Sequence, residues 1–509
     1  MNYLTGGRSP TLFSHANSRS KGRSKIKARH LLFWSLLFVA FPLASMPSAF
    51  LTLAPERLIT LSSSLAVDVF IPKAVVFIVL WLTGVSLVLP AWRARAKPLT
   101  ATKPHLYGAY RHLSAPLSWL AGFLVVLTLT SLFNHSHLQV VPLTLGHRFE
   151  NLLAILVEMA WYSVVFIAGG LVCSRVLPSR LPLTLMVCGA TALALLTLLE
   201  AAGLAPMPFG ADAGNVSATM GHQGYVAAFL GVALVVWTSW KLLSGRIALA
   251  DCAVTAILSA ALVASGGRAG LLAAVIVLLA FAAALTRHKR RHKGLLVVGL
   301  VMLVAATATV LTLPHAQQRL QRLGTAVEGM DPAVNHRLIY WQVAVKAIYD
   351  RPLFGHGVGA LSRAAWQLAT PQQADALILE FLPDSLAQDA VRIGNLAFYR
   401  EPLSRALHVK IMRPFKVHNY FLDLALASGL PALLAFTGFV LSSCRILYRA
   451  KTPLTLAVLL GLATYLLYGM VWFATLNVDP IIWGLLGAGL GSAALTLEAK
   501  SRKLQPEPR

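Results

Sequence analysis

Charged residues are scarce in this chain. Only 12% of its 509 residues are charged and just 19 are Asp or Glu, whereas a soluble domain is about a quarter charged. This composition argues against a soluble globular fold. The hydrophobic share of 57% and the mean hydropathy of +0.68 indicate a membrane protein instead.

Cysteines and nucleotide-binding motifs are equally sparse. The four cysteines fall in apolar runs or at their predicted cytoplasmic ends, so no disulfide is expected. Their spacing matches neither a zinc nor an iron–sulfur site. No Gly-rich phosphate loop is followed by Lys. The sequence therefore gives no sign of a zinc or iron–sulfur site or of an ATP-driven pump.

Apolar runs recur from end to end, and each is long enough to cross a bilayer as a helix. The first run follows a basic stretch and is too long for a signal peptide, so we interpret it as a retained span. The sequence thus predicts an all-α, polytopic transmembrane helical bundle of about 12 spans with one large helical periplasmic loop. The predicted spans are 31–53, 71–91, 114–133, 151–172, 181–202, 222–240, 247–264, 269–286, 294–313, 418–440, 454–473 and 481–498.

The distribution of Lys and Arg predicts the orientation. With the N-terminus inside, 28 of the 44 basic residues fall in cytoplasmic segments, and the short outer loops hold only Arg57, Arg148 and Arg268. This split predicts a multi-pass membrane protein with both termini in the cytoplasm. Topology and contact with anionic lipids also account for the net charge of +25, so no nucleic-acid partner is expected.

The predicted organisation has five parts. They are a disordered basic cytoplasmic tail (1–30), spans one to nine (31–313), a periplasmic loop domain (314–417), spans ten to twelve (418–498) and a cytoplasmic tail (499–509). In the loop we expect helices over 336–350 and over 384–412. In the second of these, Leu386, Ala390, Ile393 and Ala397 recur at helical spacing.

Several polar residues lie at the predicted outer ends of spans. Arg268 follows two glycines in a tight hairpin, where it either snorkels to the interface or presents its guanidinium to an anion such as phosphate. His222 and Gln223 begin the sixth span as caps or as ligands. His418 begins the tenth span, again as a cap or as a functional group. Three acidic residues embedded in or near spans receive no role: Glu158, Glu200 and Asp251.

The predicted topology places a set of basic groups on the same outer surface. They are Arg268, Arg337, Arg413, Lys416 and His418. Such a set suits an anionic, lipid-borne substrate. Neighbouring cations favour a neutral imidazole, which can accept a proton from a hydroxyl near neutral pH. Trp341 lies one helical turn from Arg337 on the same face.

These motifs resemble the O-antigen ligase and O-antigen polymerase superfamily of bacterial membrane glycosyltransferases. The resemblance rests on "SGGRAG" (265–270), "RLIYWQVAVKAIYDRPLFGHGVG" (337–359) and "VHNYFLDLALASGLPALLAF" (417–436), with a weaker match at "GHQGYVAAFL" (221–230). The chain departs from the family pattern at Ala427, where the family often has Glu. Asp423 lies one turn away and is a candidate substitute.

The resemblance implies a protein of the bacterial inner membrane that transfers a glycan from undecaprenyl pyrophosphate to an acceptor hydroxyl at the periplasmic face. His418 would activate the hydroxyl, and Arg268 and Arg337 would hold the pyrophosphate. The expected substrate-binding residues are Asn419, Lys416, Arg413, Trp341, His222 and Gln223. No metal or cofactor is implied.

The acceptor stays open at this point. It is lipid A–core in a ligase, which the loop length and span number favour, or a second lipid-linked glycan in a polymerase. Two other classes compete: an envelope-lipid transporter or flippase, and a scaffold for polysaccharide assembly. A transporter predicts a polar path through the bundle, whereas a transferase predicts one outward-facing site.

Overall fold

The fold comes from a computed structural model. It describes residues 24, 26–45, 66–93, 104–134, 145–204, 216–245, 247–286, 291–314, 316–317, 332–357, 359–382, 386, 390–393, 396–400, 406–412, 414 and 416–503. Most of the predicted N-terminal tail and the predicted site residue Arg413 lie outside these residues.

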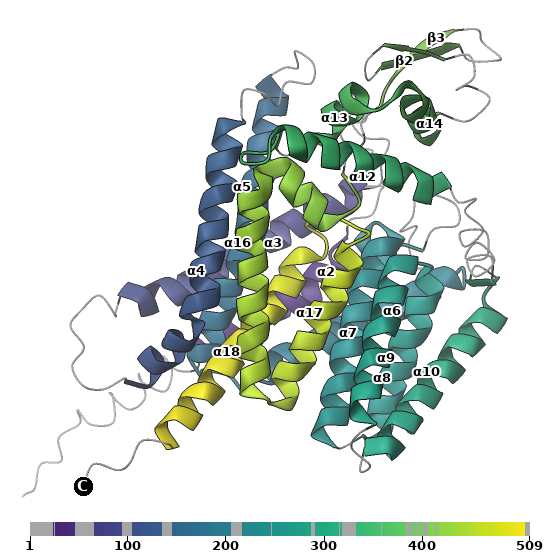
Figure 1. The fold of residues 1–509 in the computed structure, drawn as a ribbon. Coiled ribbons are helices and arrows are strands. Elements are labelled where there is room, and N and C mark those ends of the chain that lie inside the picture. The colour runs from purple at the N-terminus through teal and green to yellow at the C-terminus, as the bar shows by residue number, and fades with distance from the viewer. Residues whose placement is uncertain are drawn as a thin grey trace, which may run out of the picture.

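Long helices form most of the described chain (Figure 1). The first apolar run is the helix Ile26–Leu43, which includes η1 (Leu36–Ala40) and α2 (Phe41–Leu43). The other helices that match predicted spans are α3 (Ala66–Arg93), α4 (Pro104–Phe133), α5 (Leu145–Cys173), α6 (Leu181–Ala201), α7 (Gln223–Ser244), α8 (Leu249–Ser265), α9 (Arg268–Leu285), α10 (His292–Thr312), α16 (Tyr420–Ala450), α17 (Pro453–Gly469) and α18 (Asp479–Lys503).

Each predicted span has a helical counterpart. In the described chain, eight helices are long and apolar enough to cross a membrane. The other four predicted spans correspond to shorter apolar stretches at Pro72–Val88, Met159–Cys173, Leu249–Ser265 and Pro453–Gly469. The prediction of an all-α, polytopic helical membrane protein is confirmed.

Helix α18 lies at the centre of the bundle and packs closely against α5. The apolar stretch of α18 is 83% buried, whereas the apolar stretch of α10, at the periphery, is 11% buried. Gly487 and Gly491 allow the close contact, because an added Cβ would lie 2.5 Å from the Val165 carbonyl oxygen and 2.8 Å from that of Gly169. Small residues four positions apart commonly join membrane helices in this way.

The segment between α10 and α16 covers one end of the bundle. Helix α12 (Pro332–Asp350) lies across that end, and α13 (Leu361–Leu368) and α14 (Pro371–Phe381) lie beyond it (Figure 1). The helix predicted over 336–350 is therefore confirmed. One face of α12, which includes Tyr340 and Ala344, is buried against neighbouring elements.

The second predicted loop helix is wrong. Residues 384–412 contain an antiparallel sheet of β1 (Val391–Ile393), β2 (Leu396–Arg400) and β3 (Leu407–Ile411), in the order β1-β2-β3. Phe398 pairs with both Val391 and Val409, and aromatic and β-branched residues suit a pleated surface. Ala397 is buried among apolar residues outside the bundle core, so strand pairing overrides the helical spacing.

Helix α16 is interrupted at Gly429, whose φ of 81° is left-handed. The Gly-rich segment 352–357 fits into the interruption, and the Leu430 N–H donates to the Pro352 carbonyl oxygen (2.7 Å). A Cβ on Gly355 would lie 2.7 Å from the α16 backbone, and one on Gly429 would lie 2.3 Å from the Leu353 carbonyl oxygen. Glycine at both positions lets the loop pair with the broken helix, which fixes the loop relative to the turn before α16.

Candidate active site

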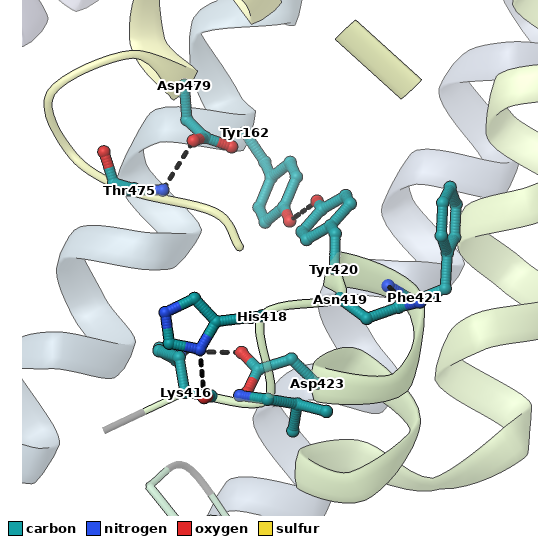
Figure 2. Close-up of polar contacts among 10 residues, drawn as sticks. Tyr162, Lys416, His418, Asn419, Tyr420, Phe421, Asp423, Thr475 and Asp479 are labelled. Carbon is teal, nitrogen blue, oxygen red and sulfur yellow. Dashed lines mark hydrogen bonds and ion pairs between the residues drawn. The ribbon is translucent and has the colours of Figure 1, made fainter. Parts of the chain in front are cut away.

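His418 occupies a strained turn immediately before α16. Its φ of 55° is left-handed, which is uncommon for a residue with a side chain and often marks a functional position. Asn419 caps the helix, because its side-chain oxygen accepts from the Phe421 N–H (3.1 Å) and the Leu422 N–H (3.0 Å). The cap and the turn together direct the imidazole away from the helix (Figure 2).

An ion pair closes the same turn. The Lys416 ammonium lies 2.8 Å from the Asp423 carboxylate, which also accepts from the Val417 N–H (3.4 Å). The Trp341 indole N–H on α12 donates to the Val417 carbonyl oxygen (3.1 Å). The backbone on the N-terminal side of His418 is thus held by groups from both α16 and α12, which supports the strained conformation.

Aromatic rings surround the imidazole. Tyr340 on α12 is nearly parallel to it, with centroids 6.3 Å apart. Trp472 and Phe473, from the segment between α17 and α18, present their rings edge-on at 5.3 Å and 5.1 Å. This enclosure leaves the ring half-buried and removes much of its contact with water.

The enclosure changes the acid–base behaviour of the imidazole. Burial, followed by the positive charge of Arg337, lowers the pKa of His418 to about 4. The Lys416 carbonyl and the Asp423 carboxylate act in the opposite direction but are outweighed, and His222 also lowers the pKa. His418 is therefore neutral at pH 7.

The hydrogen bond of the ring determines its tautomer. Nδ1 lies 3.0 Å from the Lys416 carbonyl oxygen, and a carbonyl oxygen can only accept. Nδ1 therefore carries the proton and Nε2 carries the lone pair. The arrangement orients the ring so that Nε2 can accept a proton from a hydroxyl.

Trp472 links His418 to two other predicted site residues. The Arg337 guanidinium carbon lies 5.3 Å from the centre of a Trp472 ring, which is within the range of a cation–π contact. On α7, the His222 ring centroid is 5.1 Å from that of Trp472. The structure thus brings Arg337, His222 and His418 around one indole.

His222 and Gln223 begin α7. The Nδ1 atom of His222 accepts from the Gly224 N–H (2.9 Å), so this residue caps the helix. The side-chain oxygen of Gln223 is buried and has no hydrogen-bond partner among the described residues. The indole nitrogen of Trp472 is in the same situation, although buried polar groups normally have a partner.

Arg268 is the first residue of α9, at the same end of the bundle. The turn before it is left-handed at Gly266 (φ 67°). At Gly267 an added Cβ would lie 2.8 Å from the Gln223 carbonyl oxygen. The turn that leads into Arg268 therefore packs against the first turn of α7, which contains Gln223.

The buried carboxylate of Asp479 holds the Trp472 segment in place. It accepts from the Tyr465 hydroxyl (2.8 Å), the Trp483 indole N–H (3.2 Å) and the Thr475 N–H (2.6 Å). Figure 2 shows Thr475 on the loop that leads into α18 and its contact with Asp479, the first residue of that helix. This network connects the aromatic wall to α17 and α18.

Sequence reasoning missed Tyr340, Trp472, Phe473 and Asp479. Trp472 and Phe473 were assigned to the eleventh span, but α17 ends at Gly469 and both residues lie in the following loop. The sequence "WFATLNVDP" (472–480) does carry a signal, since Asn, Asp and Pro together favour a turn.

Other predicted residues have contacts within the protein. The Asn419 amide nitrogen donates to the Met470 carbonyl oxygen (2.9 Å) in addition to its cap. Of the acidic residues without an assigned role, Asp251 pairs with Lys241 (2.9 Å), and Glu200 accepts from the Ala218 N–H (2.6 Å). The side chain of Glu158 lies outside the described part.

Comparison with known families gives one match. Residues 253–437 match the family model described as O-antigen ligase. No curated protein shows a significant match to the chain. The matched range contains Arg268, Arg337 and His418 and the pairing of the Gly-rich segment with the interrupted helix.

Proposed function

We propose that this chain, which matches the O-antigen ligase family model over residues 253–437, transfers a glycan from undecaprenyl pyrophosphate to an acceptor hydroxyl. In this proposal the His418 end of the bundle faces the periplasm, and both termini are cytoplasmic. The acceptor is lipid A–core, so the activity is that of an O-antigen ligase in the inner membrane.

The environment of His418 carries this proposal. A neutral imidazole with its lone pair on Nε2 suits a general base. The Arg337 guanidinium beside it, over Trp472, suits a phosphate oxygen, because its planar donors match that geometry. A proton acceptor and an anion-binding group in one enclosure are what a transfer from a pyrophosphate requires.

The proposed reaction is a single displacement. His418 Nε2 takes the proton of the acceptor hydroxyl as that oxygen bonds to the anomeric carbon of the glycan. The bond from this carbon to the pyrophosphate oxygen breaks, and undecaprenyl pyrophosphate leaves with the electron pair. Arg337 and Arg268 stabilise the charge that develops on the leaving group. The proton then passes from His418 to water.

The negative donor also affects the base. In the free protein Arg337 is one of the groups that lower the pKa of His418. A pyrophosphate bound to Arg337 would offset that positive charge, so it would raise the pKa of the imidazole. His418 would in this way become a stronger base only while the donor is bound.

A polymerase would use the same groups with a lipid-linked glycan as acceptor. Purified protein in vesicles, supplied with an undecaprenyl-pyrophosphate glycan and either lipid A–core or more donor, separates the two activities. Glycan on lipid A–core supports the ligase, and longer lipid-linked chains support the polymerase. Movement of donor between leaflets with no new glycosidic bond would contradict both and support a flippase.

A further inference from the structure

A groove lies at the other end of the bundle, far from His418. It has a volume of about 760 Å³ and lies between the end of α5, with the turn after it, and the last turns of α18. The Lys500 ammonium, which lines it, donates to the carbonyl oxygen of Ala450 (2.9 Å), the last residue of α16. Since His418 precedes the first residue of that 31-residue helix, roughly 45 Å separates the two sites.

The groove is positively charged. Arg175, Lys500 and Lys503 line it, and its lining contains no Asp or Glu among the described residues. The nearby Glu498 does not neutralise it, because its carboxylate is 2.8 Å from the Arg502 guanidinium. Arg175 has a left-handed φ of 55°, which places a charged residue where the end of a helix usually has glycine.

The walls of the groove are apolar. Val172 and Val176 contribute on the α5 side and Leu495 on the α18 side, and Ser179 and Thr496 add hydroxyl groups. Cations at one level and aliphatic side chains beside them match the two parts of a phospholipid, a charged head group and an acyl chain. Both walls are formed at the ends of apolar helices, where a membrane surface would lie.

We propose that this groove binds the phosphate of an anionic phospholipid, with an acyl chain against Val172, Val176 and Leu495. Arg175 contacts the phosphate through its guanidinium and Lys503 through its ammonium. The contact with Ala450 positions Lys500, whose other N–H groups can donate to the same anion. The bound lipid joins α5 to α18 and, through Lys500, to the end of α16.

General attraction between a basic protein surface and anionic lipids is the alternative. Two variants that lose the same number of positive charges distinguish general attraction from binding at a specific site. Arg175→Gln with Lys503→Gln removes two cations from the groove. Arg445→Gln with Arg449→Gln removes two exposed cations near the same end of α16, outside the residues that line the groove.

The test is native mass spectrometry of the full-length protein with phosphatidylglycerol or phosphatidylcholine. We expect the wild type and the Arg445/Arg449 variant to retain phosphatidylglycerol at least about tenfold better than the Arg175/Lys503 variant, with little retention of phosphatidylcholine. Leu495→Trp fills the groove without changing its charge and should weaken retention as well. Equal loss in both charge variants, or displacement of the lipid by millimolar inorganic phosphate, would overturn the proposal.

Discussion

At one end of the bundle, His418, Arg337, Trp472 and His222 come from separate elements and lie partly or fully buried against one another. At the other end, Arg175 and Lys503 stand exposed on two helix ends. Exposed cations remain hydrated, so placing them on a surface costs little free energy. Enclosing an imidazole beside a guanidinium costs free energy and lowers the pKa of the imidazole. The packing of the surrounding elements must therefore hold the two groups together. This difference is why we propose a reaction at the first end and lipid binding at the second.

Replacing the imidazole gives the largest expected difference between the two ends. We expect His418→Ala to lower the rate of glycan transfer by about 10²–10⁴-fold, the usual contribution of a general base. The Arg175/Lys503 variant, changed only at the other end, should keep at least half the wild-type rate in the same vesicles. An equal loss in both variants would remove the functional difference between the ends.

The interrupted helix is the next most sensitive point. Gly429→Ala forces a Cβ into a left-handed residue and against the Leu353 carbonyl oxygen, so it should destabilise the fold by about 3 kcal/mol and reduce transfer. Gly122→Ala is the control, because nothing lies within 4 Å of an added Cβ there. The midpoint of thermal unfolding measures both variants, and an unchanged midpoint for Gly429→Ala would show that the loop does not pair with α16.

The anion-binding role depends on geometry as well as charge. Arg268→Lys and Arg337→Lys keep the positive charge but lose the planar pair of donors, so we expect each to reduce transfer about tenfold or more. Lys346→Arg, at an exposed position on α12, is the control for a basic exchange. If Lys serves as well as Arg at both sites, a pyrophosphate clamp is excluded.

The smallest effect concerns pH. The proposed reaction uses neutral His418, whose pKa is lowered to about 4. We therefore expect kcat/KM to stay constant as pH falls through 6.5 and to decline only near pH 4. Arg337→Gln removes one cause of the lowering and should move the decline to higher pH. The rate of transfer is measured in vesicles at each pH. The same vesicles are then returned to pH 7, where full recovery of the rate shows that the protein did not unfold irreversibly. A decline centred near 6.5 in the wild type would indicate an imidazole exposed to water.

The spans could be predicted from the sequence because each is a continuous apolar run, and a bilayer allows few alternatives to a helix. The loop was harder. Ile393 and Ala397 have helical spacing but lie in paired strands, and the pairing of β1 with β2 and β3 depends on contacts that local spacing does not contain.

The candidate site was predictable only in part. The sequence indicated His418, Arg337 and Trp341 as polar or aromatic groups near one predicted surface, and the structure places them together. The sequence alone could not indicate that Asn419 caps a helix and also donates a hydrogen bond to Met470. Nor could it indicate that Lys416 pairs with Asp423. A site role for Trp472 could not be predicted, because an aromatic residue at the end of an apolar run is usual at a membrane interface.

If His418 accepts the proton of the acceptor hydroxyl, its loss should stop transfer without preventing donor binding. Donor binding and a single round of transfer can be recorded on the same vesicles for the wild type and for His418→Ala. We predict that the variant binds the undecaprenyl-pyrophosphate glycan within about threefold of the wild-type affinity and forms almost no product. A variant that binds the donor and transfers the glycan at the wild-type rate would show that His418 is not the base.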